Sequence, residues 1–419
     1  FEHASAMLAP TWHFLKMNDT SIKVPENLAI NSQVVVSMPL SAKGAEDEFE
    51  NAIADAQEEW EIDHPEPSFE ERAELEAFRA AEADATYGGT AQSAYQMGAD
   101  ALEDARSISV AFEHGTGDEV AAYLRYAAGK RIVVKAGVGE TVAAQVVIKA
   151  VADALSVAAV DVVAASGSAV HLSVVVDSSG LQPDACGAAG TTLRVFAGEN
   201  SQVDIVRMQT LDEGFIDIDD MGLFANSSAH ISVSQTVLGA GKSLTGLATD
   251  LRGAESRLDI DTRYLGRDEQ ERDFNYIVRH HGPKTVCNLN ANGVLAGASS
   301  KTLRGTIDLI RGAKGAMGSE NETVLLVDEG VRNKTVPVIL CNEDDVAGNH
   351  GATIGHIRPE QLFYLASRGL SQQAAERMFA SAIIEQAAID AVDDVARAGV
   401  VRLGERVEPG FAALFEEGV

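Results

Sequence analysis

Two short stretches near the middle of the chain decide its fold: HISVS at residues 230–234 and RLDID at residues 257–261. In both stretches apolar and polar residues alternate strictly. A period of two points one set of side chains inward and the other toward solvent, which predicts half-buried β-strands. A third stretch, residues 302–309, repeats the alternation less strictly.

Strand signals of this kind extend over roughly residues 107–355. Glycine and asparagine separate the apolar segments, and little helical pattern lies between them, so crossover helices are not expected. Sandwich, barrel and β-solenoid all fit this pattern. The uninterrupted length, together with Val, Ile, Leu and Ala as the inward residues, favours a solenoid of stacked ladders. No strict sequence repeat supports that choice.

Composition narrows the class of protein. The chain has 419 residues, of which 46% are hydrophobic and only 5% aromatic. The length predicts one large domain with appendages, or two to three domains. The net charge of −30 argues against binding to nucleic acid or to anionic membranes. No apolar run reaches membrane-spanning length and no signal peptide is recognisable, so we expect a cytoplasmic protein whose natural N-terminus precedes Phe1.

Residues 1–106 form an acidic N-terminal segment. Residues 46–82 contain fifteen acids against two bases, and apolar residues recur there at helical spacing. Pro65 and Pro67 divide this stretch into two predicted helices. We interpret the charge as a solvated helix face, with a docking surface for a basic partner as the alternative.

Residues 356–419 are predicted to be helical. Pro359 suits a first helical position, Gly369 a helix end and Ser371 the cap of a second helix. The second helix carries a stripe that has to be buried against the solenoid or against another subunit. The stripe consists of Ala375, Met378, Phe379, Ala382, Ile383, Gln386 and Ile389.

Common catalytic motifs are absent from the sequence. It contains no GxxxxGK[ST], no GxSxG and no HExxH, so we expect neither an ATP site of its own nor one of these enzyme classes. β-Helix lyases and hydrolases use carboxylates in a groove, and Asp217, Asp219 and Asp220 could serve in that way. A solvated acidic turn is the interpretation we favour for these three residues.

The densest group of potential metal ligands lies at residues 341–350. It combines Cys341, three acids and His350, and residues 341, 343 and 345 would share a face of a regular strand. Thiolate and imidazole are ligands that suit iron and iron–sulfur clusters. Composition alone favours ordinary core and turn roles for both residues. The adjacent His280 and His281 would point to opposite faces of a strand, so at most one could be a ligand.

The cysteines are Cys186, Cys287 and Cys341. This odd, widely spaced set contains no CxxC pair and does not form a disulfide framework. Free thiols in a reducing compartment are expected.

The same C-terminal stretches resemble the SufB/SufD family of the SUF iron–sulfur cluster assembly system. The resemblance is strong from about residue 273 to 370, diffuse over the earlier strands and absent from the acidic segment. The motifs that carry it are SKTLRG (300–305), NETVLL (321–326), NKTVPVILC (333–341), DV (345–346), HGATIG (350–355) and LFYLASRG (362–369), with PTW (10–12) and LK (15–16) near the start.

The resemblance implies a right-handed parallel β-helix with helical N-terminal and C-terminal segments. It also implies a non-catalytic scaffold that forms a heterodimer with a SufB-like paralogue, with a transient iron or iron–sulfur cluster at the subunit interface. The C-terminal helices would dock SufC, an ABC-type ATPase that hydrolyses the ATP. The residues expected at that docking surface are Leu362, Phe363, Tyr364, Arg368, Met378 and Phe379.

Within the family, two positions favour the SufD branch. Asn321 stands where SufB-like chains carry a cysteine, and Gly351 where they carry a glutamate after the histidine. The histidine of the SufD branch maps onto His350, the first candidate metal ligand. Gly348 stands where some SufD chains have a cysteine, so Cys341 is the candidate thiolate. A SufB-like homodimer that carries the cluster itself is the alternative within the family.

Overall fold

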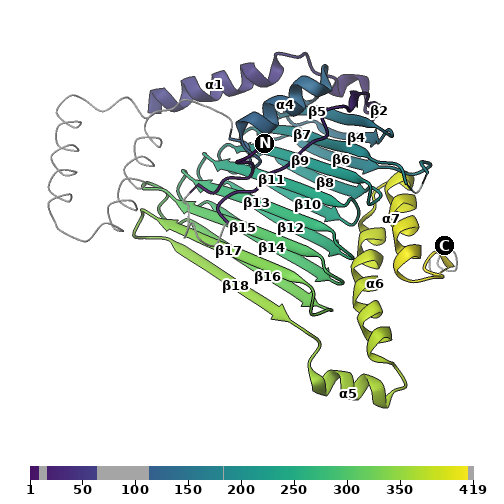
Figure 1. The fold of residues 1–419 in the computed structure, drawn as a ribbon. Helices are drawn as coiled ribbons and strands as arrows, with labels where there is room; N and C mark the ends of the chain where they lie inside the picture. The colour runs from purple at the N-terminus through teal and green to yellow at the C-terminus, as the bar shows by residue number, and fades with distance from the viewer. Residues whose placement is uncertain (9–16, 64–112, 183, 414–419) are drawn as a thin grey trace.

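The computed structural model of the chain describes residues 1–8, 17–63, 113–182 and 184–413, and two parallel sheets dominate it (Figure 1). The sheets are nine-stranded: one contains the odd-numbered strands and the other the even-numbered strands. Consecutive strands belong to opposite sheets, so each circuit of the chain adds one strand to each sheet. This is a parallel β-solenoid, and it confirms the predicted fold class.

Nearly all strand pairs are parallel and unbroken in register. The two stretches that decide the fold lie in β10 (His230–Val237) and β12 (Arg257–Gly266), which are neighbours, with Ile231 opposite Leu258. The odd-numbered strands are β1 (Ala29–Ile30), β3 (Arg131–Ala136), β5 (Ala154–Ala164), β7 (Gly187–Ala197), β9 (Phe215–Ala225), β11 (Lys242–Leu251), β13 (Glu271–His280), β15 (Ser300–Leu309) and β17 (Arg332–Cys341). The other even-numbered strands are β2 (Gln33–Ser37), β4 (Thr141–Lys149), β6 (Ala169–Asp177), β8 (Gln202–Thr210), β14 (Val286–Leu295), β16 (Met317–Leu326) and β18 (Ala347–Gly355).

The core fills the space between the two sheets. Alternate residues of each strand point inward and stack on their register partners: Val203 of β8, Ile231 of β10 and Leu258 of β12 follow one another and are fully buried. Stacking β-branched and aliphatic side chains in this way removes nearly all their apolar surface from water. The scarcity of aromatic residues in the sequence reflects this construction.

The N-terminal part differs from the expected division. Strands β1 and β2 occur within the segment expected to be helical, and β2 pairs with β4 in the only antiparallel pair among the described strands. Helix α4 (Asp118–Ala128) occurs within the expected β zone, because its apolar residues recur with the period of a helix and are buried on the outside of the odd-numbered sheet. The stretches PTW (10–12) and LK (15–16), the break at Pro65 and Pro67, and the second acidic helix lie outside the described residues.

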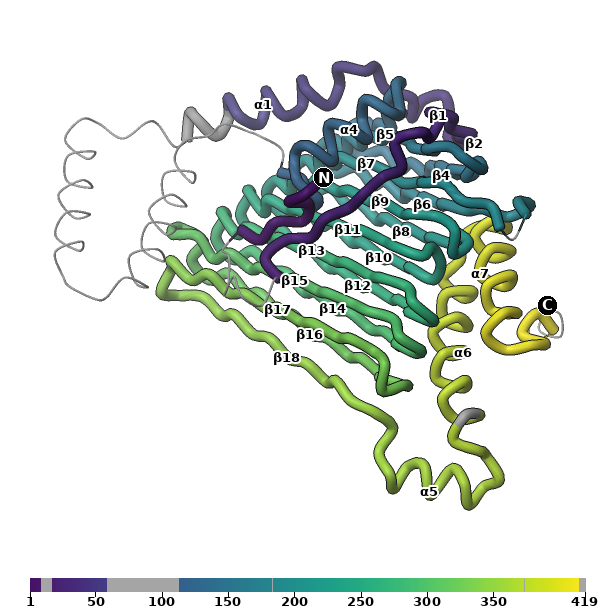
Figure 2. The backbone as a smooth tube through the Cα atoms, viewed as in Figure 1, coloured from purple at the N-terminus to yellow at the C-terminus, as the bar shows by residue number. Residues whose placement is uncertain are grey.

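The first acidic helix is present as α1 (Glu48–Asp63), and it lies on the solenoid rather than free in solvent. Phe49 is buried in a cluster with three residues of the odd-numbered sheet, and the Arg194 guanidinium lies 4.2 Å from its ring centre. Glu50 forms ion pairs with Arg131 and Arg194. The N-terminal segment before α1 also crosses the outside of this sheet, where Lys242 and Arg304 donate hydrogen bonds to its carbonyl oxygens (Figure 2).

The C-terminal helices are α5 (Pro359–Ser367), α6 (Gln372–Asp390) and α7 (Asp394–Val407). Pro359 begins α5, Gly369 adopts a φ of 86°, and the Ser371 hydroxyl accepts a hydrogen bond from Ala374 N at 3.1 Å, as the sequence predicts. The face of α6 that is buried differs from the predicted stripe. The helix packs against α7 and the outside of the even-numbered sheet through Ile384 and the small residues Ala380, Ala387 and Ala388.

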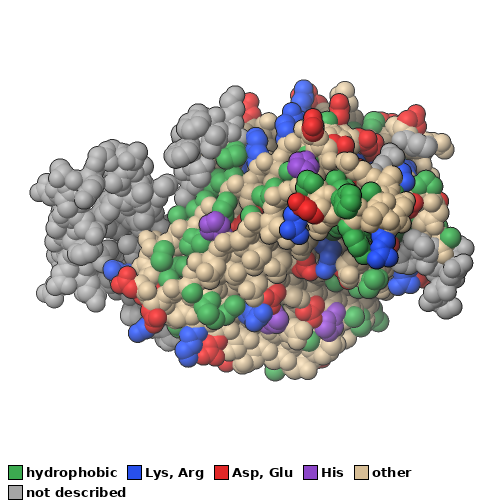
Figure 3. Space-filling view, turned by 90° about the horizontal axis from the view of Figure 1, so that it is seen from below, with side chains coloured by type: hydrophobic (Ala, Val, Ile, Leu, Met, Phe, Trp, Pro, Cys, Tyr) green, Lys and Arg blue, Asp and Glu red, His purple; other side chains and the backbone are tan. Residues whose placement is uncertain are grey.

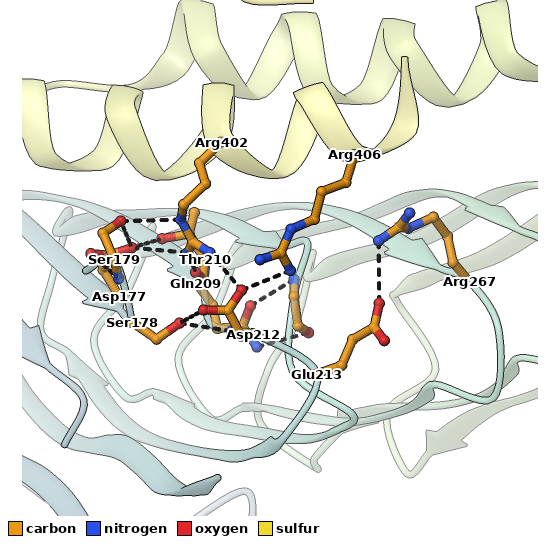
Figure 4. A network of polar contacts seen from close by, with 11 residues as sticks. Asp177, Ser178, Ser179, Gln209, Thr210, Asp212, Glu213, Arg267, Arg402 and Arg406 are labelled. Atoms are coloured by element: carbon orange, nitrogen blue, oxygen red, sulfur yellow. Dashed lines mark hydrogen bonds and ion pairs between the residues drawn. The ribbon is translucent and has the colours of Figure 1, made fainter. Parts of the chain in front are cut away.

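Helix α7 is joined to the solenoid by a polar network (Figure 4). The Asp212 carboxylate, in the turn after β8, accepts ion pairs from Arg402 at 2.6 Å and from Arg406 at 2.7 Å. Arg402 also donates to the Thr210 carbonyl and lies 3.4 Å from Asp177. The C-terminal helices thereby return to the N-terminal half of the solenoid. None of the helices in the described ranges has the length and apolarity needed to cross a membrane.

Candidate functional site

The C-terminal end of the solenoid is formed by β17 and β18, the last strands of the two sheets. Each of them pairs with one neighbouring strand only, β15 and β16 respectively, among the described residues. Residues 347–354 of β18 are all exposed. Figure 3 shows this side of the molecule, where hydrophobic side chains are interspersed with acidic, basic and histidine side chains. We call the space bounded by the inward side chains of β17 and β18 the open end.

His350 stands on the inward face of β18. Its register partner is Glu320 of β16, which is buried between the sheets. The neighbouring positions confirm the alternation: a Cβ on Gly348 would lie 2.8 Å from the inward side chain of Ile339, and one on Gly351 would meet the outward Asn321. His350 is exposed because β18 is the last strand of its sheet in the described part of the chain.

Cys341 is the last residue of β17 and is also exposed at the open end. It pairs in register with the buried Leu309, and its Sγ donates to the carbonyl of Glu343 at 3.3 Å. The expectation that residues 341, 343 and 345 share a strand face is wrong, because the strand ends at Cys341 and the chain turns toward β18. Among the residues that the structure describes, no three His, Cys, Asp or Glu side chains are placed to hold a metal ion.

The strands next to the open end, β15 and β16, carry buried charged residues that the sequence analysis did not propose as site residues. Lys301 and Glu322, from opposite sheets, form a fully buried ion pair. Thr335 donates to the second carboxylate oxygen of Glu322 at 2.5 Å, and the Tyr264 hydroxyl donates to the first at 3.3 Å. Burial lowers the pKa of Lys301, and Glu322 opposes that shift. The pair is therefore neutralised and hydrogen-bonded within the core.

Glu320 lies beside this pair but outside its hydrogen bonds. Its side chain is on the inward face, the residue is 4% exposed, and no hydrogen bond or ion pair links it to another described residue. Desolvation, followed by repulsion from Glu322, raises the pKa of Glu320 to about 7. Polar residues at alternating inward strand positions, as here in ENETV (320–324), are the sequence signal that could have identified both glutamates.

The three aspartates considered for a lyase groove are all buried in β9. Asp217 and Asp219 point inward and pair with the buried Arg207 of β8 at 2.7 and 2.8 Å. Asp220 points outward and accepts hydrogen bonds from His114 and Thr116. The interpretation as a solvated turn is wrong, because Arg207 on the facing strand and the donors His114 and Thr116 compensate these buried carboxylates. No groove exposes them.

The paired histidines point to opposite faces, as predicted. His280 is buried, and its Nδ1 lies 2.7 Å from the Thr285 hydroxyl, which itself donates to the carbonyl of Gly282. Nδ1 is therefore the donor, and Nε2 accepts from the Cys287 thiol at 3.2 Å. Burial lowers the pKa of His280 to about 4 and raises that of Cys287 to about 12, so both are neutral core groups. His281 pairs on the outer face with Asp250.

The residues predicted to meet a partner lie mainly on the surface of α5 and α6. Phe363 is 78% exposed and Tyr364 57%, and Met378 and Phe379 are exposed on α6. Leu362 is half-buried, and Arg368 lies over the Tyr364 ring. No residue of α5 is buried, so this apolar surface does not pack on the described part of the chain.

Comparison with known proteins gives evidence about the family of this chain that does not depend on its structure. A family model described as "SUF system FeS cluster assembly, SufBD core domain" matches residues 133–383. The iron–sulfur cluster assembly protein SufD of Bacillus subtilis is 27% identical over 203 residues, covering 47% of this chain and 46% of that protein. SufD of Escherichia coli is 28% identical over 166 residues, 39% of each chain. SufB of Bacillus subtilis is 28% identical over 116 residues, 28% of this chain and 25% of that protein.

In each of these relatives the match spans less than half of the protein's own length. The family model, in contrast, covers more than half of this chain and includes the strands that form the open end. The parallel solenoid agrees with the fold that the sequence motifs imply. The chain belongs to the SufB/SufD family of the SUF iron–sulfur cluster assembly system and is SufD-like.

Proposed function

We propose that this chain is a SufD-like scaffold subunit that pairs with a SufB-like paralogue, docks a SufC-like ATPase and contributes His350 to a transient iron or iron–sulfur cluster site at the interface. The exposed position of His350, facing inward on the terminal strand of the solenoid, carries the proposal. The chain itself is a non-catalytic scaffold in the cytoplasm, where its three cysteines remain free thiols.

The free edge of β18 supports the pairing with a paralogue. Its backbone N–H and C=O groups on that side have no strand partner among the described residues. Uncovered edges of this length are templates for another strand, and proteins normally protect them. A terminal strand of a SufB-like chain would satisfy these groups and bring its own ligands beside His350.

The chemistry of an imidazole suits a temporary site. Neutral imidazole binds iron, yet a single protein ligand holds the metal weakly enough for transfer. Iron and sulfide are the cargo in this proposal rather than resident cofactors. Cys341, exposed at the end of β17, is the second ligand candidate from the sequence, because its thiol is at the same end of the solenoid.

The apolar surface of α5 and the start of α6 supports the docking of an ATPase. Phe363 and Tyr364 expose large apolar areas to water. Exposed apolar patches of this kind are typical of protein–protein contact surfaces. Helix α6 connects this surface to α7, which is ion-paired to the solenoid. Movement of a docked ATPase would therefore be transmitted to the body of the scaffold.

Replacing His350 tests the proposal directly. His350→Ala should leave the fold and the subunit complex intact but impair maturation of iron–sulfur proteins in cells. His356→Ala is the matched control, because His356 is also exposed and follows β18 closely. Full maturation with His350→Ala would refute the role of this residue.

A SufB-like role has one observation in its favour, the match to SufB of Bacillus subtilis. In that case the chain would form a homodimer and hold a cluster by itself. Anaerobic reconstitution with iron and sulfide separates the two functions: a stable, stoichiometric cluster on this chain alone would favour the SufB-like role.

A further inference from the structure

Glu320 and His350 occupy the same inward column of the even-numbered sheet. They are register partners on β16 and β18, and adjacent strands lie about 4.8 Å apart. No described residue of the solenoid lies above His350 in this column. An atom entering the open end therefore reaches the imidazole first and the carboxylate directly below it.

Gly305 makes room for the Glu320 carboxylate. A Cβ on Gly305, in the facing sheet, would lie 2.5 Å from Glu320 Oε2. The carboxylate therefore spans the space between the sheets and takes the place of a side chain at that position. Pro337, the register partner of Gly305, lies at the level of His350 on the facing strand. The strand register thus places these four residues together at the open end.

Glu320 has no direct ion pair with a described residue, and the Lys301 ammonium acts on it only as a neighbouring charge, whereas Glu322 is paired with Lys301 directly. Glu322 has the Lys301 ammonium and two hydroxyl donors. Glu320 is 4% exposed and has none of these partners. Burying a carboxylate without a cation or donor is unfavourable, and such groups in native proteins are commonly found where a metal or another charge joins them.

We propose that Glu320 is the second ligand from this chain for iron(II), which it binds together with His350 at the open end. Imidazole with carboxylate is a donor combination that iron(II) accepts, and the pair leaves coordination positions for donors of another subunit or for sulfide. The inference rests on the proposed function and deepens it. It distinguishes Glu320, a ligand, from Glu322, which maintains the core.

Cobalt(II) is a suitable probe, since its visible absorption reports the ligands. The full chain, purified with the subunits that accompany it, is titrated with cobalt(II) without oxygen. Glu320→Gln should weaken binding at least about tenfold and change the spectrum. Gly305→Ala should also weaken it, because the added methyl displaces the carboxylate while both ligands remain. Asn321→Ala, on the outward face of the same strand, is the control and should bind as the wild type does.

Thermal unfolding of the metal-free protein separates a ligand from a structural residue. Because Glu320 has no cation of its own, Glu320→Gln should keep or raise the melting temperature. A loss of melting temperature with unchanged cobalt binding would overturn the proposal.

The other outcomes are equally decisive. If Glu320→Gln binds cobalt as the wild type does while His350→Ala loses it, Glu320 is not a ligand and the proposed function stands. If His350→Ala also binds normally, or the wild type takes up no cobalt, both the inference and the site at His350 fail.

Discussion

Arg402 of α7 and Asp212 in the turn after β8 form an ion pair with 2.6 Å between Nη1 and Oδ1, although 190 residues separate them. Asp212 is almost fully buried and accepts Arg406 as well. The pair joins the C-terminal helices to the first half of the solenoid, because α7 is the last helix of the described chain and β8 is an early strand. This carboxylate therefore contributes to the attachment of α7, beside the apolar contacts of the C-terminal helices with the even-numbered sheet.

Asp212→Asn should reduce the free energy of unfolding by about 2 kcal/mol, since two arginines lose their anion and one of them is partly screened by water. Denaturant titration measures this change, and limited proteolysis should show earlier cleavage near α7. Arg397→Ala is the matched control: this residue is exposed on the same helix and should change stability by less than about 0.5 kcal/mol. Equal stability of wild type and Asp212→Asn would show that the ion pairs of Asp212 do not stabilise the attachment of α7.

The buried pair Lys301–Glu322 predicts strong non-additivity. Lys301→Met leaves a buried carboxylate without its cation and should cost about 3–5 kcal/mol of folding free energy. The double variant Lys301→Met with Glu322→Leu removes both charges and should be more stable than the single variant. A double-mutant cycle from denaturant unfolding measures the coupling. Costs that simply add would show that the two side chains do not interact.

His280 predicts a specific dependence of stability on pH. Its pKa is about 4 in the folded chain, against 6.5 when unperturbed, because burial disfavours the imidazolium. Between these values the unfolded chain binds more protons, so the free energy of unfolding falls as the pH decreases through this window. Compared with His280→Gln, the wild type should lose about 2 kcal/mol between pH 7.5 and pH 5.

Denaturant unfolding of both proteins across this range isolates His280 from the other titrating groups. The exposed His356→Gln variant serves as the control and should follow the wild type. Parallel pH curves for wild type and His280→Gln would mean that the imidazole takes up its proton normally in the folded chain.

The surface of α5 should matter for partners and not for folding. Phe363→Ser with Tyr364→Ser removes exposed apolar side chains, so stability should change by less than about 0.5 kcal/mol. Co-purification of the SufC-like ATPase should be lost. Tyr126→Ser is the control: this residue is 78% exposed on α4, at the opposite end of the molecule from α5 (Figure 1). Retention of the ATPase by the double variant would locate the docking surface elsewhere.

The strands could be predicted from the sequence because the alternation of polar and apolar residues is a local property. The polar–apolar period of β10 and β12 depends only on neighbouring residues, and the register confirms the inward positions that it predicts. Helix signals at Pro359 and Ser371 were readable for the same reason. The face on which α6 is buried was predicted incorrectly, because small residues such as Ala387 and Ala388 fit closely against α7 and the sheet while larger ones remain outside.

The sequence alone determined that this chain builds short strands with inward aliphatic residues, and its motifs indicated the family, the parallel solenoid and His350 as a candidate ligand. Only the tertiary structure decided which charges meet. Asp217 and Glu322 are compensated by Arg207 and Lys301, while Glu320 is left beneath His350 without a cation. The physical reason is that the facing sheets bring Arg207 and Lys301 against carboxylates of the opposite sheet, while stacking of the turns places His350 one strand beyond Glu320. No pattern of neighbouring residues encodes these pairings.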